Sequence, residues 1–91
     1  MPFDPASQLR ARARHLRDLA VRIERTPALR LDGWADVDTW RGPRADECRR
    51  LLHDAQHRCH AAADDLRRQA WQLERRADEL DTVRRALGVA G

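Results

Sequence analysis

Apolar residues recur at helical spacing in two stretches of this chain, and a segment containing proline and glycine separates the two stretches. In the first stretch the large apolar positions lie seven residues apart, at Leu9, Leu16 and Ile23. Asp4 and Pro5 suit the start of a helix, because an aspartate can cap free N–H groups and a proline loses no hydrogen bond there. Pro27 disfavours helical geometry in the residue before it. The pattern predicts a helix over about 5–26.

The second stretch carries a longer heptad pattern. Its apolar members are Ala45, Leu52, Cys59, Leu66, Leu73, Leu80 and Leu87. Pro43 suits a first helical position and Gly88 a helix end, so we expect a helix over about 43–87, on the order of 65 Å long. The shorter first helix cannot cover this whole stripe, so part of it should face another chain.

The chain of 91 residues is long enough for one small domain, over 1–91, with a connector at 27–42 between the helices. Only 17 residues are Leu, Ile, Val or Phe, which is too few for a deep core. We therefore expect an all-α helical hairpin that completes its core by pairing into a four-helix bundle, as a homodimer or a heterodimer. A thin hairpin offers no cleft, and no phosphate-binding loop or catalytic constellation is present. The sequence predicts no enzyme and no catalytic, cofactor-binding or metal-binding residues.

The histidines and cysteines of the second predicted helix are the residues that most resemble a metal or redox site. His53, His57 and His60 share helical spacing, but they lie opposite the apolar stripe, which favours a solvated face over a metal site. Cys48 and Cys59 would be about 16 Å apart on one helix, too far for a disulfide. We expect both to be reduced apolar fillers.

The charge pattern leaves an alternative function open. The net charge is +3, and the first helix carries six arginines against two acidic residues. A basic dimeric nucleic-acid-binding helical protein is therefore the alternative, although aromatic residues make up only 4% and the arginines could equally meet acidic residues of a protein partner. No apolar run is long enough to span a membrane, and the N-terminus has no secretory signal peptide pattern.

The junction between the two predicted helices reads Thr39-Trp40-Arg41-Gly42-Pro43-Arg44-Ala45-Asp46. With its Trp-x-Gly motif between an amphipathic first helix and a heptad-patterned second helix, the chain resembles the WXG family of small helical hairpins handled by type VII (ESX-type) secretion. The octet is most similar to actinobacterial members. The resemblance implies a chaperone-like subunit that pairs with another WXG-like protein or with the helical N-terminal domain of a larger secreted toxin. Such a chain would be cytoplasmic before export and would leave the cell with its partner.

Two departures from the family pattern matter. Family members that carry the export signal have Tyr-x-x-x-Asp/Glu after the second helix, and this chain has no tyrosine, so a partner would have to supply the signal. The connector at 27–39 shortens the first helix, and it is either a special contact surface or a tolerated loop.

The motif and the stripes give the predicted site residues. Trp40 and Gly42 form the turn motif, where the tryptophan would plug the end of the bundle and the glycine would allow a tight turn. Small residues, including Ala70 and Ala77, should let helix backbones approach closely. The residues predicted to face the partner are Leu9, Leu16, Leu19, Ile23, Leu52, Ala55, Cys59, Ala62, Leu66, Leu73 and Leu80.

Overall fold

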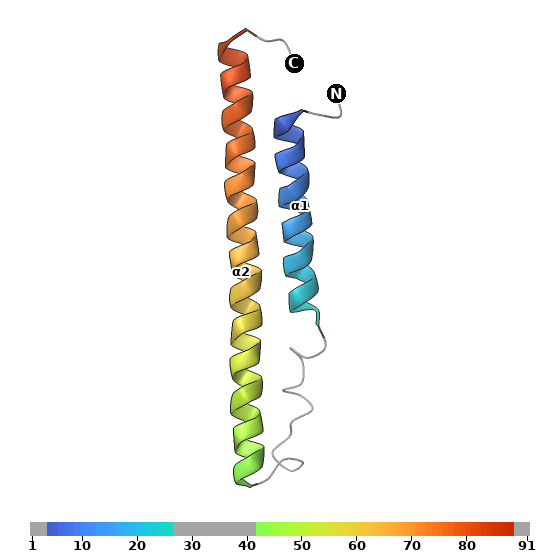
Figure 1. Cartoon of the computed structure of the whole chain (residues 1–91), viewed down its shortest axis with the longest axis vertical. Coiled ribbons are helices and arrows are strands. Elements are labelled where there is room, and N and C mark those ends of the chain that lie inside the picture. The colour runs from blue at the N-terminus through green and yellow to red at the C-terminus, as the bar shows by residue number, and fades with distance from the viewer. Residues whose placement is uncertain (1–3, 27–41, 89–91) are drawn as a thin grey trace.

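The protein is a hairpin of two antiparallel α-helices (Figure 1). A computed structural model describes residues 4–26 and 42–88, and within these ranges it contains helix α1 at Pro5–Glu24, helix α2 at Pro43–Ala86, and no strand. This confirms the predicted all-α hairpin, and the two predicted helices agree with the observed bounds to within two residues at each end. Trp40 and the connector at 27–39 lie outside the described residues.

Each helix begins at a proline, as the sequence predicts. Asp4 precedes α1, but its carboxylate does not cap the helix. It accepts a hydrogen bond from the hydroxyl of Ser7 at 2.9 Å instead. Gly42 precedes α2 with φ +96° and ψ 174°, a conformation that is essentially restricted to glycine. A Cβ atom at Gly42 would meet no heavy atom within 4 Å, so the backbone angles alone account for the need for glycine.

Helix α2 ends where the sequence predicts. The N–H of Leu87 donates to the carbonyl of Val83 at 2.9 Å, and the N–H of Gly88 donates to the carbonyl of Arg85 at 3.1 Å. Gly88 has φ +72°, the left-handed geometry that often terminates helices. The left-handed Gly88 therefore marks the end of α2.

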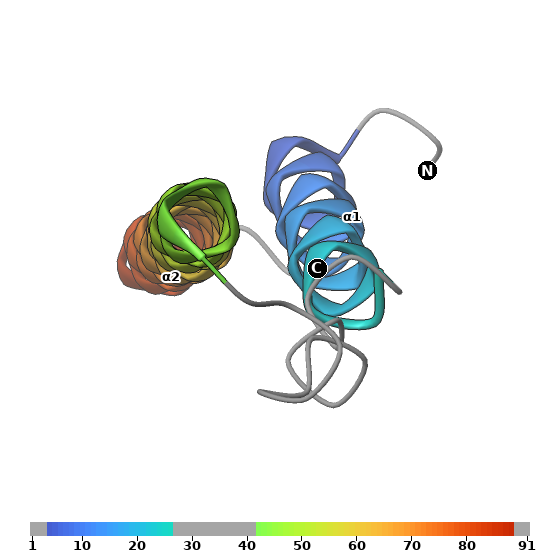
Figure 2. The same cartoon turned by 90° about the horizontal axis from the view of Figure 1, so that it is seen from below.

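Alanines form the contact line between the helices. Three on each helix are at most 1% exposed and recur every seven residues: Ala6, Ala13 and Ala20 on α1, and Ala63, Ala70 and Ala77 on α2. No larger side chain among the described residues is fully buried. Because a methyl group is the only side chain between the backbones, the helices lie close together along this alanine seam, and the view along their axes shows them side by side (Figure 2).

Both helices carry the same seven-residue repeat around the seam. Three residues after a seam alanine comes a large apolar residue, and the next residue is charged. The leucine row consists of Leu9, Leu16 and Ile23 on α1 and Leu66, Leu73 and Leu80 on α2. The charged row consists of Arg10, Arg17 and Glu24 on α1 and Arg67, Glu74 and Asp81 on α2. Since successive residues are about 100° apart around a helix, the seam lies between the two rows.

Helix α1 pairs with the C-terminal part of α2 only. The last ion pair between the helices joins Glu24 to Arg67, and no described helix lies beside α2 over residues 43–59. Helix α2 runs unbroken for 44 residues and spans most of the 69 Å length of the molecule (Figure 1). Neither helix is long and apolar enough to cross a membrane within the described ranges.

Candidate partner-binding interface

Ion pairs across the helices close one side of the alanine seam. They are Arg10–Asp81 at 2.6 Å, Arg10–Asp78 at 2.9 Å, Arg17–Glu74 at 2.5 Å, Arg84–Asp4 at 2.9 Å, and Arg67–Glu24. The charged row reads basic, basic, acidic along α1 and basic, acidic, acidic along α2. Only the antiparallel register observed here gives every member of the charged row an opposite charge, so these pairs specify the register.

These pairs shift the ionisation of their members. The guanidinium of Arg17 donates to Glu74 and lowers the pKa of that carboxyl group below its ordinary value of 4.5. Hydrogen bonds to Asp81 and then Asp78 raise the pKa of Arg10. The side chains of Arg17 and Glu74 are 42% and 38% exposed, so solvent screens their attraction and the pair contributes more to register than to stability.

The leucine row forms an apolar face on the other side of the seam. All six of its side chains are half-buried, and each is the residue immediately before a member of the charged row. The ion pairs therefore place Leu9 level with Leu80, Leu16 with Leu73, and Ile23 with Leu66. No other described element covers these three levels from outside. We call this surface the leucine face.

The residues predicted to face a partner all lie on this side of the hairpin. Six are the leucine row itself, and Leu52 and Cys59 continue that row along α2 beyond the end of α1. Leu19, Ala55 and Ala62 lie farther out from the seam, because each follows a leucine-row position by three residues rather than four. The hairpin thus gathers residues from both helices onto one surface.

The alanines that bring the backbones together are only in part the ones that the sequence interpretation emphasised. Ala62 is exposed, whereas its neighbour Ala63 is fully buried in the seam. Ala70 and Ala77 act as expected in allowing close approach, but within the hairpin. The missed signal was the spacing of Ala63, Ala70 and Ala77, which repeats that of the three seam alanines on α1.

The histidines and cysteines form no cluster in the described residues. No group of three His, Cys, Asp or Glu side chains that could hold a metal ion occurs over 4–26 and 42–88. His53, His57 and His60 are exposed. Cys48 is an exposed free thiol and Cys59 a half-buried one.

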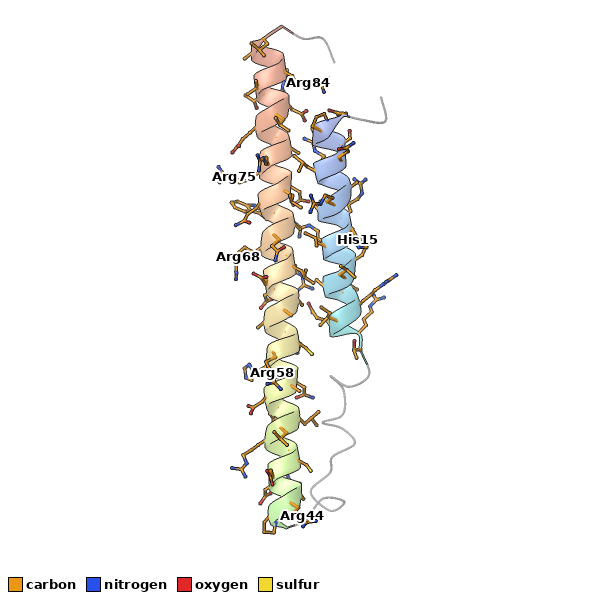
Figure 3. All side chains as sticks on the ribbon, in the orientation of Figure 1. His15, Arg44, Arg58, Arg68, Arg75 and Arg84 are labelled. Carbon is orange, nitrogen blue, oxygen red and sulfur yellow. The ribbon has the colours of Figure 1, made fainter. Side chains whose placement is uncertain are left out.

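A second surface feature lies on the charged side. The side chain of Trp71 is 52% exposed, and the guanidinium carbon of Arg75 lies 5.1 Å from the centre of its ring, within cation–π distance. Arg75 projects from the side of α2 away from α1 (Figure 3). An open groove passes beside this pair, lined by Arg10, Arg14, Trp71, Glu74, Arg75 and Asp78. Sequence reasoning did not single out this groove, which depends on side chains from both helices.

Comparison with known proteins identifies no relative. No model of a known protein family matches the chain, and searches of curated proteins and of solved structures find no significant match. The leucine face and the charged row are interpreted from their own residues and geometry.

Proposed function

We propose that this chain is a partner-binding, chaperone-like subunit associated with type VII (ESX-type) secretion. Its leucine face would pair with another small helical hairpin, or with the helical N-terminal domain of a larger secreted toxin, to form a four-helix bundle. The observation that carries the proposal is the leucine face itself, where apolar side chains of both helices are aligned at three levels and left half-buried.

The distribution of apolar surface explains why a partner would bind there. The seam fully buries only methyl groups, and the large side chains of the leucine row stay half-buried in the hairpin alone. Burial of apolar surface contributes about 25 cal/mol per Å² removed from water. A second amphipathic hairpin laid on the leucine face would bury these side chains and its own apolar stripe together. The partner would thereby be kept in solution.

The link to secretion rests on the resemblance in the turn motif. Trp40-Arg41-Gly42 immediately precedes α2, and Gly42 has backbone angles that favour glycine strongly. Since the chain has no tyrosine, the partner would carry the export signal. A chain that binds the partner, while the partner carries the export signal, would act as a chaperone-like subunit.

The proposal is tested with the full chain, tagged and purified under native conditions from its own host. We expect a helical partner in stoichiometric amount, whose release into the medium requires the type VII secretion ATPase. Ala62→Arg replaces a methyl group beside the leucine face with a bulky charged side chain that would hold a partner helix away, so it should abolish pairing. Ala61→Arg is the matched control, because Ala61 is also exposed but lies about 100° farther around the helix. Survival of the complex in Ala62→Arg, or release that does not depend on the ATPase, would count against the proposal.

A basic nucleic-acid-binding function is the second candidate, and the exposed Trp71 favours it. Trp71 stacked under Arg75 could support a base, and the unpaired Arg14 lines the same groove. Against this function, Arg10 and Arg17 are already engaged by carboxylates. An electrophoretic shift of single-stranded DNA at physiological salt that falls steeply as salt rises would favour this candidate.

A further inference from the structure

The leucine face is bordered by a third set of positions, the outer row, which consists of Arg12 and Leu19 on α1 and Ala55, Ala62, Gln69, Arg76 and Val83 on α2. Each outer-row residue follows a leucine-row position by three residues. It therefore lies about 60° from that position, on the side away from the seam. All are exposed except Leu19 and Ala55, which are half-buried. Any partner on the leucine face would meet these side chains at its edges.

Two arginines are the only charged residues of the outer row, and they lie opposite each other. Arg12 is two residues after Arg10, and Arg76 is two residues before Asp78, the ion-pair partner of Arg10. In the antiparallel register Arg12 and Arg76 are therefore level, one on each edge of the leucine face. Neither forms an ion pair with another described residue, so both charges are available to a partner.

The acidic residues of the hairpin are placed elsewhere. Asp78, Asp81 and Glu74 are held by arginines on the charged side of the seam. The acidic residues nearest the outer row are Asp65 and Glu79, which share one heptad position. Asp65 is engaged by Arg68 at 3.2 Å and by Gln69 at 2.7 Å, and Glu79 lies three residues after Arg76. The leucine row and the outer row contain no acidic residue.

Because the outer row carries basic residues and no acidic one, a second copy of the chain and a different partner would interact with it differently. A second copy would bring the same rows to the interface, and neither row supplies a carboxylate opposite Arg12 or Arg76. With the two copies parallel, Arg12 of one would face Arg76 of the other, a like-charge contact that disfavours pairing. A partner with acidic side chains at these positions would instead form charge-assisted hydrogen bonds at both edges.

We infer that the leucine face selects a helical hairpin whose apolar stripe has an acidic side chain on each edge, level with Arg12 and Arg76, in preference to a second copy of this chain. Arg12 and Arg76 are the residues that determine this specificity. The inference rests on the proposed function, since it specifies the partner of the same face.

The chain itself supplies the probe. The double variant Arg12→Glu/Arg76→Glu keeps the leucine row and the seam and replaces both basic edges with acidic ones. Wild type, the variant and their equimolar mixture are compared by sedimentation velocity and native mass spectrometry at physiological salt. We expect a 1:1 complex in the mixture whose Kd is at least about tenfold lower than that for self-association of either chain.

A matched control separates edge pairing from general charge attraction. Arg22→Glu/Arg50→Glu makes the same charge change at exposed arginines that belong to none of the rows. Its mixture with wild type should associate no more tightly than wild type alone. Circular dichroism of both double variants checks that the helices remain intact. High salt should weaken the acidic-edge complex, because it screens the edge pairs.

The outcomes distinguish the inference from the proposed function. If wild type self-associates as tightly as the acidic-edge mixture and Ala62→Arg abolishes this association, the face pairs as proposed but the preference for acidic edges is overturned. If the acidic-edge mixture associates no more than the separate chains, the inference is also overturned. In that case the Ala62→Arg purification from the native host still decides the proposed function.

Discussion

Alanine methyl groups set the distance between the helices, and one glycine sets the direction in which α2 begins. The six seam alanines are at most 1% exposed, and Gly42 has angles that other residues avoid. Neither feature depends on a large side chain. Substitutions that add a few carbon atoms should therefore have large effects at these positions and small effects one or two residues away.

Replacing Gly42 by alanine tests the backbone requirement. A residue forced into this region of φ and ψ costs about 1–3 kcal/mol, so Gly42→Ala should lower the free energy of unfolding by that amount. Urea denaturation followed by circular dichroism measures the change. Arg44→Ala, on an exposed residue of the first turn of α2, is the control and should change stability little. Unchanged stability in Gly42→Ala would mean that the backbone relaxes to a negative φ at little cost.

The run Ala61-Ala62-Ala63 contains its own control for the seam. Ala63 is fully buried and Ala61 is exposed. Ala63→Leu overfills the contact line and should destabilise the hairpin by about 1–3 kcal/mol. Ala61→Leu should lie within about 0.5 kcal/mol of wild type, because an exposed substitution changes no packing. Equal effects of the two substitutions in thermal melts would contradict the seam.

The two helices recognise each other through complementary orders of charge. Spacing within one helix would pair each acid with the arginine four residues on, such as Asp81 with Arg85 and Asp46 with Arg50. The structure instead joins Asp81 to Arg10 across the helices, and Asp46 to Arg49 rather than Arg50. The pairs between helices could not be predicted from spacing alone, because they depend on the register, and the register depends on both helices at once.

A charge swap tests this recognition. Arg17→Glu places two glutamates face to face and should lower the melting temperature by a few degrees. Adding Glu74→Arg restores opposite charges and should recover most of the loss. Melting curves of the two single variants and the double variant measure the coupling between the sites. If the double variant is as unstable as the sum of the single ones, the pair has no role in holding the register.

Acid should weaken the same contact. Arg17 holds the pKa of Glu74 below its ordinary value of 4.5, so the stabilisation is present above that pH and is lost as the pH falls through the lowered pKa. The pKa of Asp4, lowered from 3.8 chiefly by the hydrogen bond from the Ser7 hydroxyl, acts in the same direction. Melts between pH 7 and pH 3 should show falling stability below about pH 4.5. Glu74→Gln should make the melting temperature depend less on pH. An unaltered dependence would mean that this carboxylate does not contribute to the loss of stability in acid.

The helices were predictable from local patterns, and the division of their surfaces was predictable only in part. Prolines, the terminal glycine and heptad spacing gave the bounds of both helices, because these signals act within a few residues. Leucine spacing correctly identified one apolar stripe. Ala63 and its seam were missed, because alanine fits a buried position as readily as an exposed one. Which alanines are buried becomes clear only when the matching seven-residue spacings on the two helices are considered together.

Across the length of the molecule, α2 has two environments. Residues 63–81 pack on α1 through the seam and the ion pairs, whereas residues 43–59 have no described helix beside them. One continuous helix therefore joins a segment held within the hairpin to a segment whose apolar positions, Leu52 and Cys59, continue the leucine row.

Hydrogen exchange should report this difference. In the isolated chain, amides over 46–59 should exchange faster than those over 66–81, because the second segment is held by the alanine seam and by the ion pairs to α1. Binding of a partner along the whole leucine row should slow exchange in both segments. Uniform protection along α2 in the isolated chain would mean that the first segment is already held as firmly as the second.

A contact line made of methyl groups also affects how stability depends on temperature. The heat-capacity change of unfolding comes mainly from apolar surface that becomes hydrated, and the fully buried side chains here expose little of it. The curve of free energy against temperature should therefore be shallow for the hairpin alone, with little loss of stability on cooling. A partner on the leucine face would bury more apolar surface. The free energy of unfolding should therefore depend on temperature with stronger curvature in the complex than in this chain alone.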